Sequence, residues 1–336
     1  MRTILFAAGQ AGSVAYLRPL LERWLASKTA PDWRIALTKD CRDRLAARDA
    51  ERYRVLRDEP KTIEDLELLL ADWSPDLVVA ATSRTAVEDI AFHYARARKL
   101  PVLRFFDTWY HYRERLSLTN GDFALPDKVL VIDACAVTEA EQAGVPRHLL
   151  TAVGHPAWEA IDILPTADRR DVMFVSQPVR RHFGETLGYT EDQVWRSLVE
   201  IARANPDRFR HIYFVPHPAD DMAAPKQSDF VTVMRSSHDA LRLVGTVVGM
   251  FSSFLVDAVL SGRHVVSFQP NAVGKDMNAW CRTDGVIPRV TNLQMLLSAM
   301  QSPKLAADEL RAVLSRSCER VEEVLVGISV SRGRHS

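Results

Sequence analysis

The stretch TVVGMFSSFLVDAVLSGRHVVSF at residues 246–268 decides how this chain folds. Its apolar runs at residues 247–250 and 264–268 are typical of short buried strands. Residues 253–261 between them have helical spacing, and Gly262 ends that helix. The two strands are expected to be parallel, because a helical crossover is how parallel strands are joined. The stretch therefore predicts a βαβ unit of an α/β protein.

The same alternation of strand and helix extends outward over nearly the whole chain. In the first half it predicts strands at residues 4–8, 34–37, 76–81, 101–106, 128–132 and 149–153, and helices at residues 64–71 and 85–98. In the second half it predicts strands at residues 171–175, 211–215 and 231–234, and helices at residues 191–204, 293–300 and 306–326. The polar segment LPTADRR at residues 164–170 separates the two series.

This organisation predicts two Rossmann-like domains, residues 1–163 and 171–336, joined by a linker at residues 164–170. A chain of 336 residues also exceeds the length of about 250 residues at which single cores stop growing. We expect the domains to face each other across a ligand cleft, because ligands of such sheets bind beyond the carboxyl ends of the strands. The residues that directly follow each strand are therefore the candidates for function.

The composition excludes several classes of partner. Lys plus Arg equals Asp plus Glu at 43 each, and a net charge of zero argues against binding nucleic acid or anionic membranes through bulk charge. No apolar run approaches the roughly 20 residues of a membrane span. The four cysteines form no CxxC pair, and no His, Asp or Glu cluster has metal-ligand spacing. We expect a cytoplasmic protein without a metal site, and its oligomeric state stays open.

His217 follows the predicted strand at residues 211–215 and lies between Pro216 and Pro218. Proline fixes the backbone angle φ, so the two prolines stiffen this loop and would aim the imidazole into the cleft. A histidine there could donate a hydrogen bond to a phosphate or act as a general acid. The alternative is an ordinary loop histidine without a ligand.

Ser252 and Ser253 follow the strand at residues 247–250 and begin the next helix. Two hydroxyls and the unpaired N–H groups of a helix N-terminus can hold a phosphate without a cation. The alternative is that Ser252 merely caps the helix, which explains one serine better than two.

The first half offers two candidate loops. Gly9, Gln10 and Gly12 belong to the loop GQAGS, which could present backbone N–H groups to an anion, although it is neither GxGxxG nor a P-loop. The alternative is a tight turn. Asp107 ends the strand at residues 101–106 and could deprotonate a hydroxyl, unless it only caps the next helix. The molecule that carries this hydroxyl, the acceptor, would be bound by Gly9, Gln10, Gly12, Trp109, Tyr110 and Arg113, with the aromatic rings stacked on a sugar face.

His155 follows Gly154 where the first domain passes into the second. It could line the cleft, and it could equally be a histidine of an ordinary turn.

The segments FVSQP, FVPHPAD and VVGMFSSFLVDAVLSGRHVVSFQP together resemble the GT-B superfamily of nucleotide-sugar enzymes. Their order is similar to that of the HP and SS motifs of bacterial sialyltransferases and polysialyltransferases. The resemblance implies that His217, Ser252 and Ser253 contact the phosphate of a CMP-linked donor. It adds Gln177, Pro218 and Gly249 to the donor site, and it implies that a C-terminal helix packs back across the domain junction.

The catalytic base of those transferases is a carboxylate in an acidic-acidic-Gly motif. This chain has Phe106, Asp107 and Thr108 at the corresponding strand end, so only Asp107 matches. The chain is also similar to UDP-GlcNAc 2-epimerases, with Gly154, His155 and Pro156 in place of their Gly-Asn-Pro. Their Ser-Gly-Gly and Gln-Glu-Glu signature is replaced by FSSFLVDA. CDP-glycerol glycerophosphotransferases likewise have a His-Pro loop and a serine-rich helix start.

The sequence and the resemblance together predict a metal-independent GT-B glycosyltransferase of polysaccharide biosynthesis that needs no cofactor. It would transfer a sugar, preferably a nonulosonic acid carried on CMP, to the hydroxyl of a glycan, lipid or protein acceptor. Asp107 and His217 would be its catalytic residues. The alternatives are a nucleotide-sugar 2-epimerase, a glycerophosphotransferase of the same fold, and a non-catalytic ligand-binding protein.

Overall fold

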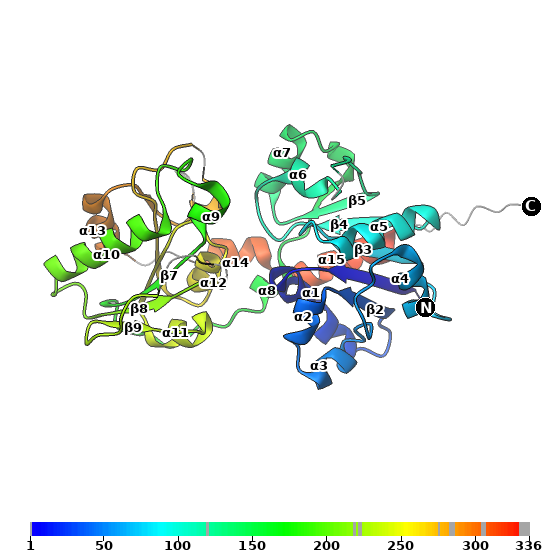
Figure 1. The fold of residues 1–336 in the computed structure, drawn as a ribbon, viewed down its shortest axis with the longest axis horizontal. Helices are drawn as coiled ribbons and strands as arrows, with labels where there is room; N and C mark the ends of the chain where they lie inside the picture. The colour runs from blue at the N-terminus through cyan, green and yellow to red at the C-terminus, as the bar shows by residue number, and fades with distance from the viewer. Residues whose placement is uncertain are drawn as a thin grey trace, which may run out of the picture. The chain divides into compact units, whose positions relative to one another are not determined.

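The computed structural model describes residues 2–118, 121–217, 220, 224–274, 276–281, 286–303 and 307–328 (Figure 1). The chain forms two compact units. Unit 1 comprises Met1–Ala160 and Ala312–Ser336, and unit 2 comprises Ile161–Arg311. Residues 312–336 therefore belong to the first unit, although they were expected in the second domain, residues 171–336.

The segment expected to be a linker, residues 164–170, lies within unit 2. The backbone N–H of Leu164 donates to the carbonyl of Ser261 at 3.0 Å, and Arg263 donates to the carbonyl of Pro165 at 2.6 Å. These bonds hold the segment against its own unit.

Unit 1 contains a parallel six-stranded sheet in the order β2-β1-β3-β4-β5-β6. Its strands are β1 (Thr3–Ala8), β2 (Asp32–Leu37), β3 (Leu77–Ala81), β4 (Val102–Phe105), β5 (Lys128–Val131) and β6 (Leu150–Ala152). The strand LVVAA of β3 is buried along its whole length, as expected for a central parallel strand that helices cover on both faces. The apolar runs in the sequence reflect this burial.

Helices cover both faces of this sheet (Figure 1). One face packs against α1 (Ala11–Leu25) and α15 (Ser317–Gly327), and the other against α4 (Ile63–Leu70) and α5 (Ala86–Ala97). The shorter helices of unit 1 are α2 (Lys39–Asp43), α3 (Ala47–Arg52), α6 (Tyr112–Leu116), α7 (Ala134–Gln142) and α8 (Pro156–Glu159).

Unit 2 contains a second parallel six-stranded sheet, in the order β12-β11-β10-β7-β8-β9. Its strands are β7 (Asp171–Val175), β8 (His211–Val215), β9 (Val231–Val233), β10 (Thr246–Gly249), β11 (His264–Phe268) and β12 (Arg289–Val290). Its helices are α9 (Val179–Phe183), α10 (Glu191–Ala204), α11 (Ser237–Leu243), α12 (Phe254–Leu260) and α13 (Leu293–Gln301). The predicted βαβ stretch corresponds to β10, α12 and β11.

The chain reverses its direction of progress through each sheet at one point. In unit 1 this point lies between β1 and β3, and in unit 2 it lies between β7 and β10. Loops that leave neighbouring strands toward opposite sides open a crevice at the carboxyl ends, which is where ligands of open α/β sheets bind. The fold therefore directs attention to the loops after these four strands.

The prediction of a single helix at residues 306–326 is wrong. The described residues form two helices, α14 (Asp308–Leu314) and α15, and Arg316 between them has φ of 59°. A left-handed residue cannot continue a right-handed helix, so the chain changes direction there. The hydroxyl of Ser317 donates to the carbonyl of Leu314 and thereby closes the bend.

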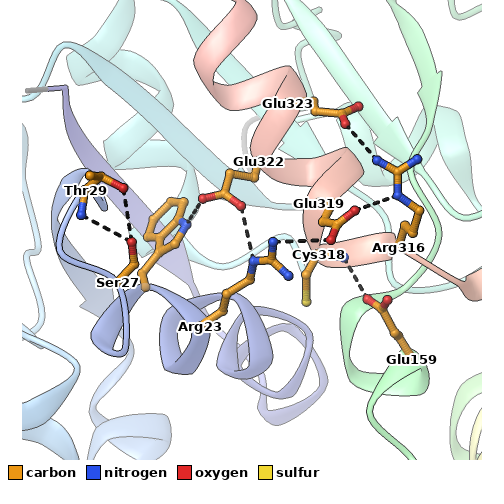
Figure 2. A network of polar contacts seen from close by, with 10 residues as sticks. Arg23, Ser27, Thr29, Glu159, Arg316, Cys318, Glu319, Glu322 and Glu323 are labelled. Carbon is orange, nitrogen blue, oxygen red and sulfur yellow. Dashed lines mark hydrogen bonds and ion pairs between the residues drawn. The ribbon is translucent and has the colours of Figure 1, made fainter.

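Charged side chains of α15 contact α1 within unit 1, as Figure 2 shows. The Glu322 carboxylate accepts from Nε1 of Trp24 at 2.8 Å and lies 3.4 Å from Nε of Arg23. Arg23 also pairs with Glu319 at 3.3 Å. These contacts border apolar packing by Val321 and Leu325, so α15 is an integral part of the first unit.

Within the described residues, no helix combines the length and the apolar character that crossing a membrane requires.

Candidate functional site

The crevice of unit 2 is bordered by the loops that follow β7 and β10. Gln177 lies just beyond β7, and its side-chain Oε1 accepts the backbone N–H of Phe251, just beyond β10, at 2.9 Å. This bond ties the two loops together across the reversal point of the sheet. Because Oε1 is used in this way, the group that Gln177 can offer to a ligand is its NH2 donor.

A buried polar network holds the loop that carries Ser252 and Ser253. The carbonyl of Met250 accepts from Nε2 of Gln269 at 3.0 Å and from the hydroxyl of Ser267. The side-chain amide of Asn278 donates to the carbonyl of Ser252 at 3.3 Å. These supporting residues were not among the predicted ones, although polar side chains at the end of the apolar strand HVVSF are a signal that could have found Ser267 and Gln269.

The two serines have different surroundings. Ser252 is half-buried, and its hydroxyl accepts the backbone N–H of Phe254 at 3.2 Å. Ser253 is exposed and makes no side-chain capping bond to α12. Ser252 therefore is not the N-cap of α12 but lies one residue before it and bonds to the first N–H of the helix, while the hydroxyl of Ser253, the N-cap, lies at the surface.

Gly249 lies at the end of β10 and has a clear packing role. A Cβ atom on this residue would lie 2.8 Å from Cγ1 of Val175 and 2.9 Å from Cδ2 of Leu255. Only glycine lets β10 approach β7 and α12 this closely.

His217 has an exposed side chain at the carboxyl end of β8. Its backbone N–H donates to Oδ2 of Asp220 at 2.8 Å, and its carbonyl accepts the N–H of Asp220 at 3.0 Å. Asp220 therefore holds the backbone of His217 in place. Partial burial, together with nearby His182, lowers the pKa of His217, although Asp220 opposes the shift. Pro218 lies outside the described residues.

His182 of α9 was not among the predicted residues, yet it lies close enough for its charge to act on His217. It belongs to the run VRRHF that follows Gln177 and Pro178. The run of basic side chains after a strand end is the signal that points to it.

Asp107 in unit 1 lies beyond β4 and is held by Arg115. Its Oδ1 accepts from Nη2 of Arg115 at 2.6 Å, and Nε of the same arginine donates to the carbonyl of Thr82 at 2.8 Å. Burial raises the pKa of Asp107, but the Arg115 guanidinium outweighs it and the pKa is lowered. Asp107 is therefore an ionised carboxylate. It does not cap the following helix, because His111 occupies the N-cap of α6.

The structure separates the aromatic residues predicted beside Asp107. Trp109 is buried, donates from Nε1 to Oδ2 of Asp133 at 2.9 Å and stacks on Trp158. Tyr110 is only partly exposed and lies near Asp107, whose charge adds to the burial that raises the pKa of this phenol. Arg113 is exposed, with its guanidinium over the ring of Phe123. Of the three, Tyr110 is the one placed with Asp107.

The loop after β1 packs tightly against α5. The N–H of Gly9 donates to Oε1 of Glu88 at 3.0 Å, and a Cβ on Gly9 would lie 1.9 Å from Oγ1 of Thr85. Gln10 is exposed and forms the N-cap of α1 without a side-chain bond. Gly12 faces Asp107, because a Cβ there would lie 3.1 Å from Oδ2 of Asp107. Glu88, whose pKa is raised by burial, was not among the predicted residues.

Metal ligands are absent from this arrangement as far as the structure describes it. No group of three His, Cys, Asp or Glu side chains among the described residues could hold a metal ion.

Comparison with known proteins identifies the fold. No family model matches the chain, and no curated protein matches it in sequence. Among solved structures, UDP-GlcNAc 2-epimerase from Methanocaldococcus jannaschii is similar, with a TM-score of 0.66 at 12% identity, covering 97% of this chain and 99% of that one. UDP-GlcNAc 2-epimerase from Neisseria meningitidis bound to UDP-GlcNAc has a TM-score of 0.62 at 12% identity, with 96% and 99% covered.

The lipopolysaccharide outer core galactosyltransferase WaaB has a TM-score of 0.58 at 10% identity, with 97% of this chain and 99% of that chain covered. Together with the two parallel six-stranded sheets, these likenesses show that the chain has the GT-B fold. The predicted fold class is confirmed.

Proposed function

We propose that this chain is a GT-B glycosyltransferase that moves a sugar from a nucleotide-activated donor to an acceptor hydroxyl. The observation that carries the proposal is the bond from Phe251 to Gln177. It holds the loop of Ser252 and Ser253 beside the loop after β7, at the reversal point of the unit 2 sheet. Such a crevice is where an α/β sheet binds its nucleotide.

The phosphate groups of the nucleotide would lie against uncharged hydrogen-bond donors of unit 2. The NH2 group of Gln177 and the hydroxyl of Ser253 can donate to phosphate oxygens. His217 at the end of the neighbouring strand would donate to the leaving phosphate as negative charge develops on it, which stabilises the transition state. This set of groups works without a metal ion.

Asp107 of unit 1 would accept the hydrogen bond of the attacking hydroxyl. Because Arg115 keeps this carboxylate ionised, it orients the nucleophile and draws off its proton as the new bond forms.

The test is a thermal-shift screen against CMP, CDP, UDP, GDP and dTDP. A nucleotide at 100 times its Kd stabilises the folded protein by about 2.7 kcal/mol. We expect one nucleotide to raise the Tm of the wild type and to lose this effect in His217→Ala and in Ser252→Ala/Ser253→Ala. CMP would indicate a nonulosonic acid donor, and UDP a hexose or hexosamine donor.

His211→Ala is the matched control. His211 lies at the opposite end of the same strand β8, where its ring contacts the carbonyl of Asp229 and the hydroxyl of Thr232. This variant is expected to lower the starting Tm but to keep the nucleotide-dependent shift. If no nucleotide shifts the wild type, the proposed function is wrong.

A second candidate is a UDP-GlcNAc 2-epimerase, which the whole-chain overlap with the epimerase of M. jannaschii supports. Incubation with UDP-GlcNAc alone distinguishes the two activities. An epimerase forms the 2-epimer of this nucleotide sugar without any acceptor, whereas a transferase needs an acceptor or releases UDP by hydrolysis.

A further inference from the structure

Two buried polar side chains in unit 1, Tyr16 and His155, have polar atoms without a hydrogen-bond partner among the residues that the structure describes. Tyr16 is 1% exposed and His155 is 5% exposed, yet no described residue pairs with Oη of Tyr16 or Nδ1 of His155. The two rings touch edge to face, with centroids 4.8 Å apart. An unpaired buried polar group is costly, so two such groups in contact indicate a place where a ligand completes the bonding.

The surroundings hold both rings in position. Tyr16 stacks on Phe105 at 4.5 Å between centroids, and His155 stacks on Trp158 at 3.9 Å. The backbone N–H of His155 donates to the hydroxyl of Ser317 at 3.0 Å, so α15 fixes the loop that carries the imidazole. A site whose groups are already oriented loses little entropy when it binds.

Asp107 belongs to the same cluster. Gly12 lies one helical turn before Tyr16 on α1, and a Cβ on Gly12 would lie 3.1 Å from Oδ2 of Asp107. The charge of Asp107 also acts on both rings. Burial raises the pKa of Tyr16, and Asp107 raises it further. Burial lowers the pKa of His155, and Asp107 opposes this shift. The net pKa of His155 is about 4, so its imidazole is neutral at neutral pH.

We propose that Tyr16, His155 and Asp107 form a binding site for an uncharged ligand hydroxyl, and that the hydroxyl is that of a sugar. This inference rests on the proposed function, in which this sugar is the acceptor of the glycosyl transfer. The hydroxyl donates to Nδ1 of His155 and accepts from Oη of Tyr16, which pairs both unsatisfied atoms, whereas a hydroxyl that donates to Asp107 instead pairs Tyr16 alone.

The charges of the cluster disfavour an anionic ligand. Arg115 is engaged by Asp107, Thr108 and the carbonyl of Thr82. Arg320, whose charge also acts on Tyr16, donates to the carbonyls of Val153 and Val313. A phosphate or carboxylate at the site would meet the ionised Asp107, whose charge acts on Tyr16 more strongly than that of Arg320, so an uncharged hydroxyl is favoured.

The test measures binding of the methyl glycosides of glucose, galactose and N-acetylglucosamine by saturation-transfer NMR and by titration. Glucose 1-phosphate and glucuronate are the anionic comparison. We expect at least one uncharged glycoside to bind the wild type and the anionic sugars to bind more weakly. Tyr16→Phe and His155→Gln should each weaken the glycoside about 3- to 10-fold, as the loss of one hydrogen bond predicts.

Tyr53→Phe and His264→Gln are the matched controls. Tyr53 is a buried tyrosine of the same unit whose hydroxyl donates to Glu22, and His264 is a buried histidine at the start of β11 in unit 2. Both variants should bind the glycoside as the wild type does. Thermal unfolding of every variant identifies any that fails to fold. If His155→Gln fails, the test rests on Tyr16→Phe, which removes a single oxygen atom.

Three outcomes would overturn the inference. They are the absence of glycoside binding to the wild type, binding that Tyr16→Phe and His155→Gln leave unchanged, and tighter binding of the anionic sugars. Nucleotide binding measured in parallel separates this inference from the proposed function. A nucleotide that binds without any glycoside overturns only the hydroxyl site, whereas a glycoside that binds without any nucleotide overturns only the transferase.

Discussion

Gln177 and Phe251 lie 74 residues apart in the chain, yet the side-chain carbonyl of the first accepts the backbone N–H of the second at 2.9 Å. The bond joins the loops after β7 and β10 at the point where the sheet of unit 2 reverses its strand order. The position of Ser252 and Ser253 thus depends on a residue from a distant part of the sequence.

Gln177→Leu should destabilise the protein by about 1–3 kcal/mol, because the N–H of Phe251 loses its acceptor. Urea unfolding measures this change, and the nucleotide-dependent Tm shift should fall in the same variant. Gln177→Glu keeps an acceptor oxygen and is the control for stability. Equal stability of the Leu variant and the wild type would show that the bond does not hold the loop.

Gly154→Ala should be among the more destabilising single substitutions in unit 1. Gly154 has φ of 82°, and a Cβ on it would lie 2.0 Å from Oγ of Ser317, so the new methyl group adds both backbone strain and a steric clash. We expect a loss of about 1–3 kcal/mol in the free energy of unfolding.

Gly184→Ala serves as the control for backbone strain alone. Gly184 has φ of 58°, but a Cβ there would meet no atom within 4 Å. The difference between the two variants measures the clash with Ser317, and Ser317→Gly should recover part of it in the double variant. A loss in Gly154→Ala no larger than in Gly184→Ala would contradict the close contact of this loop with α15.

Acid should destabilise the protein through His155. Its pKa is about 4 when folded, against about 6.5 when unfolded, because burial disfavours the charged imidazole. The unfolded chain therefore binds a proton between these values that the folded chain does not. The contribution of the neutral His155 to the free energy of unfolding is complete above pH 6.5 and declines as the pH falls toward 4.

His155→Gln removes this proton uptake, so the loss of stability between pH 7 and pH 5 should be smaller in the variant than in the wild type. Chemical unfolding at the two pH values measures it, and the carboxylates other than Asp107, which interacts with His155, contribute equally to both proteins. An identical pH dependence of the two proteins would mean that His155 is already protonated in the folded state.

Asp107→Asn should lower turnover of the bound nucleotide sugar by about 10²- to 10⁴-fold, the range that removal of a proton acceptor produces. Release of free nucleotide is the measurement. Nucleotide binding should not change, because Asp107 belongs to unit 1 and the nucleotide is expected on unit 2. Asp127→Asn, at an exposed carboxylate paired with Arg96, is the control. Full activity of Asp107→Asn would remove this residue from the reaction.

Much of the fold could be predicted from apolar periodicity. The strand expected at residues 171–175 is β7 residue for residue, and the strand expected at 211–215 is β8. Both are continuous apolar runs that parallel sheets bury on two faces, so the pattern is strong. The two-residue strand β12 and the short helices α2, α3 and α9 carry too little pattern to be recognised.

The candidate site was predicted less completely, and the reason is physical. Asp107 and His217 were found because each lies at the end of an apolar strand, and Gln177 was found through the resemblance. Tyr16 received no role because it lies on the apolar face of an amphipathic helix, where an aromatic residue is normally part of the core. Whether its hydroxyl has a partner depends on residues far away in the chain.

The sequence by itself determined where strands and helices form and which residues leave the strand ends, because these features depend on local spacing of apolar side chains. Only the tertiary structure decided the strand order, the assignment of α15 to unit 1 and the meeting of Tyr16, His155 and Asp107. These features depend on contacts between segments that are distant in the chain, and no local pattern records which distant partner a side chain will meet.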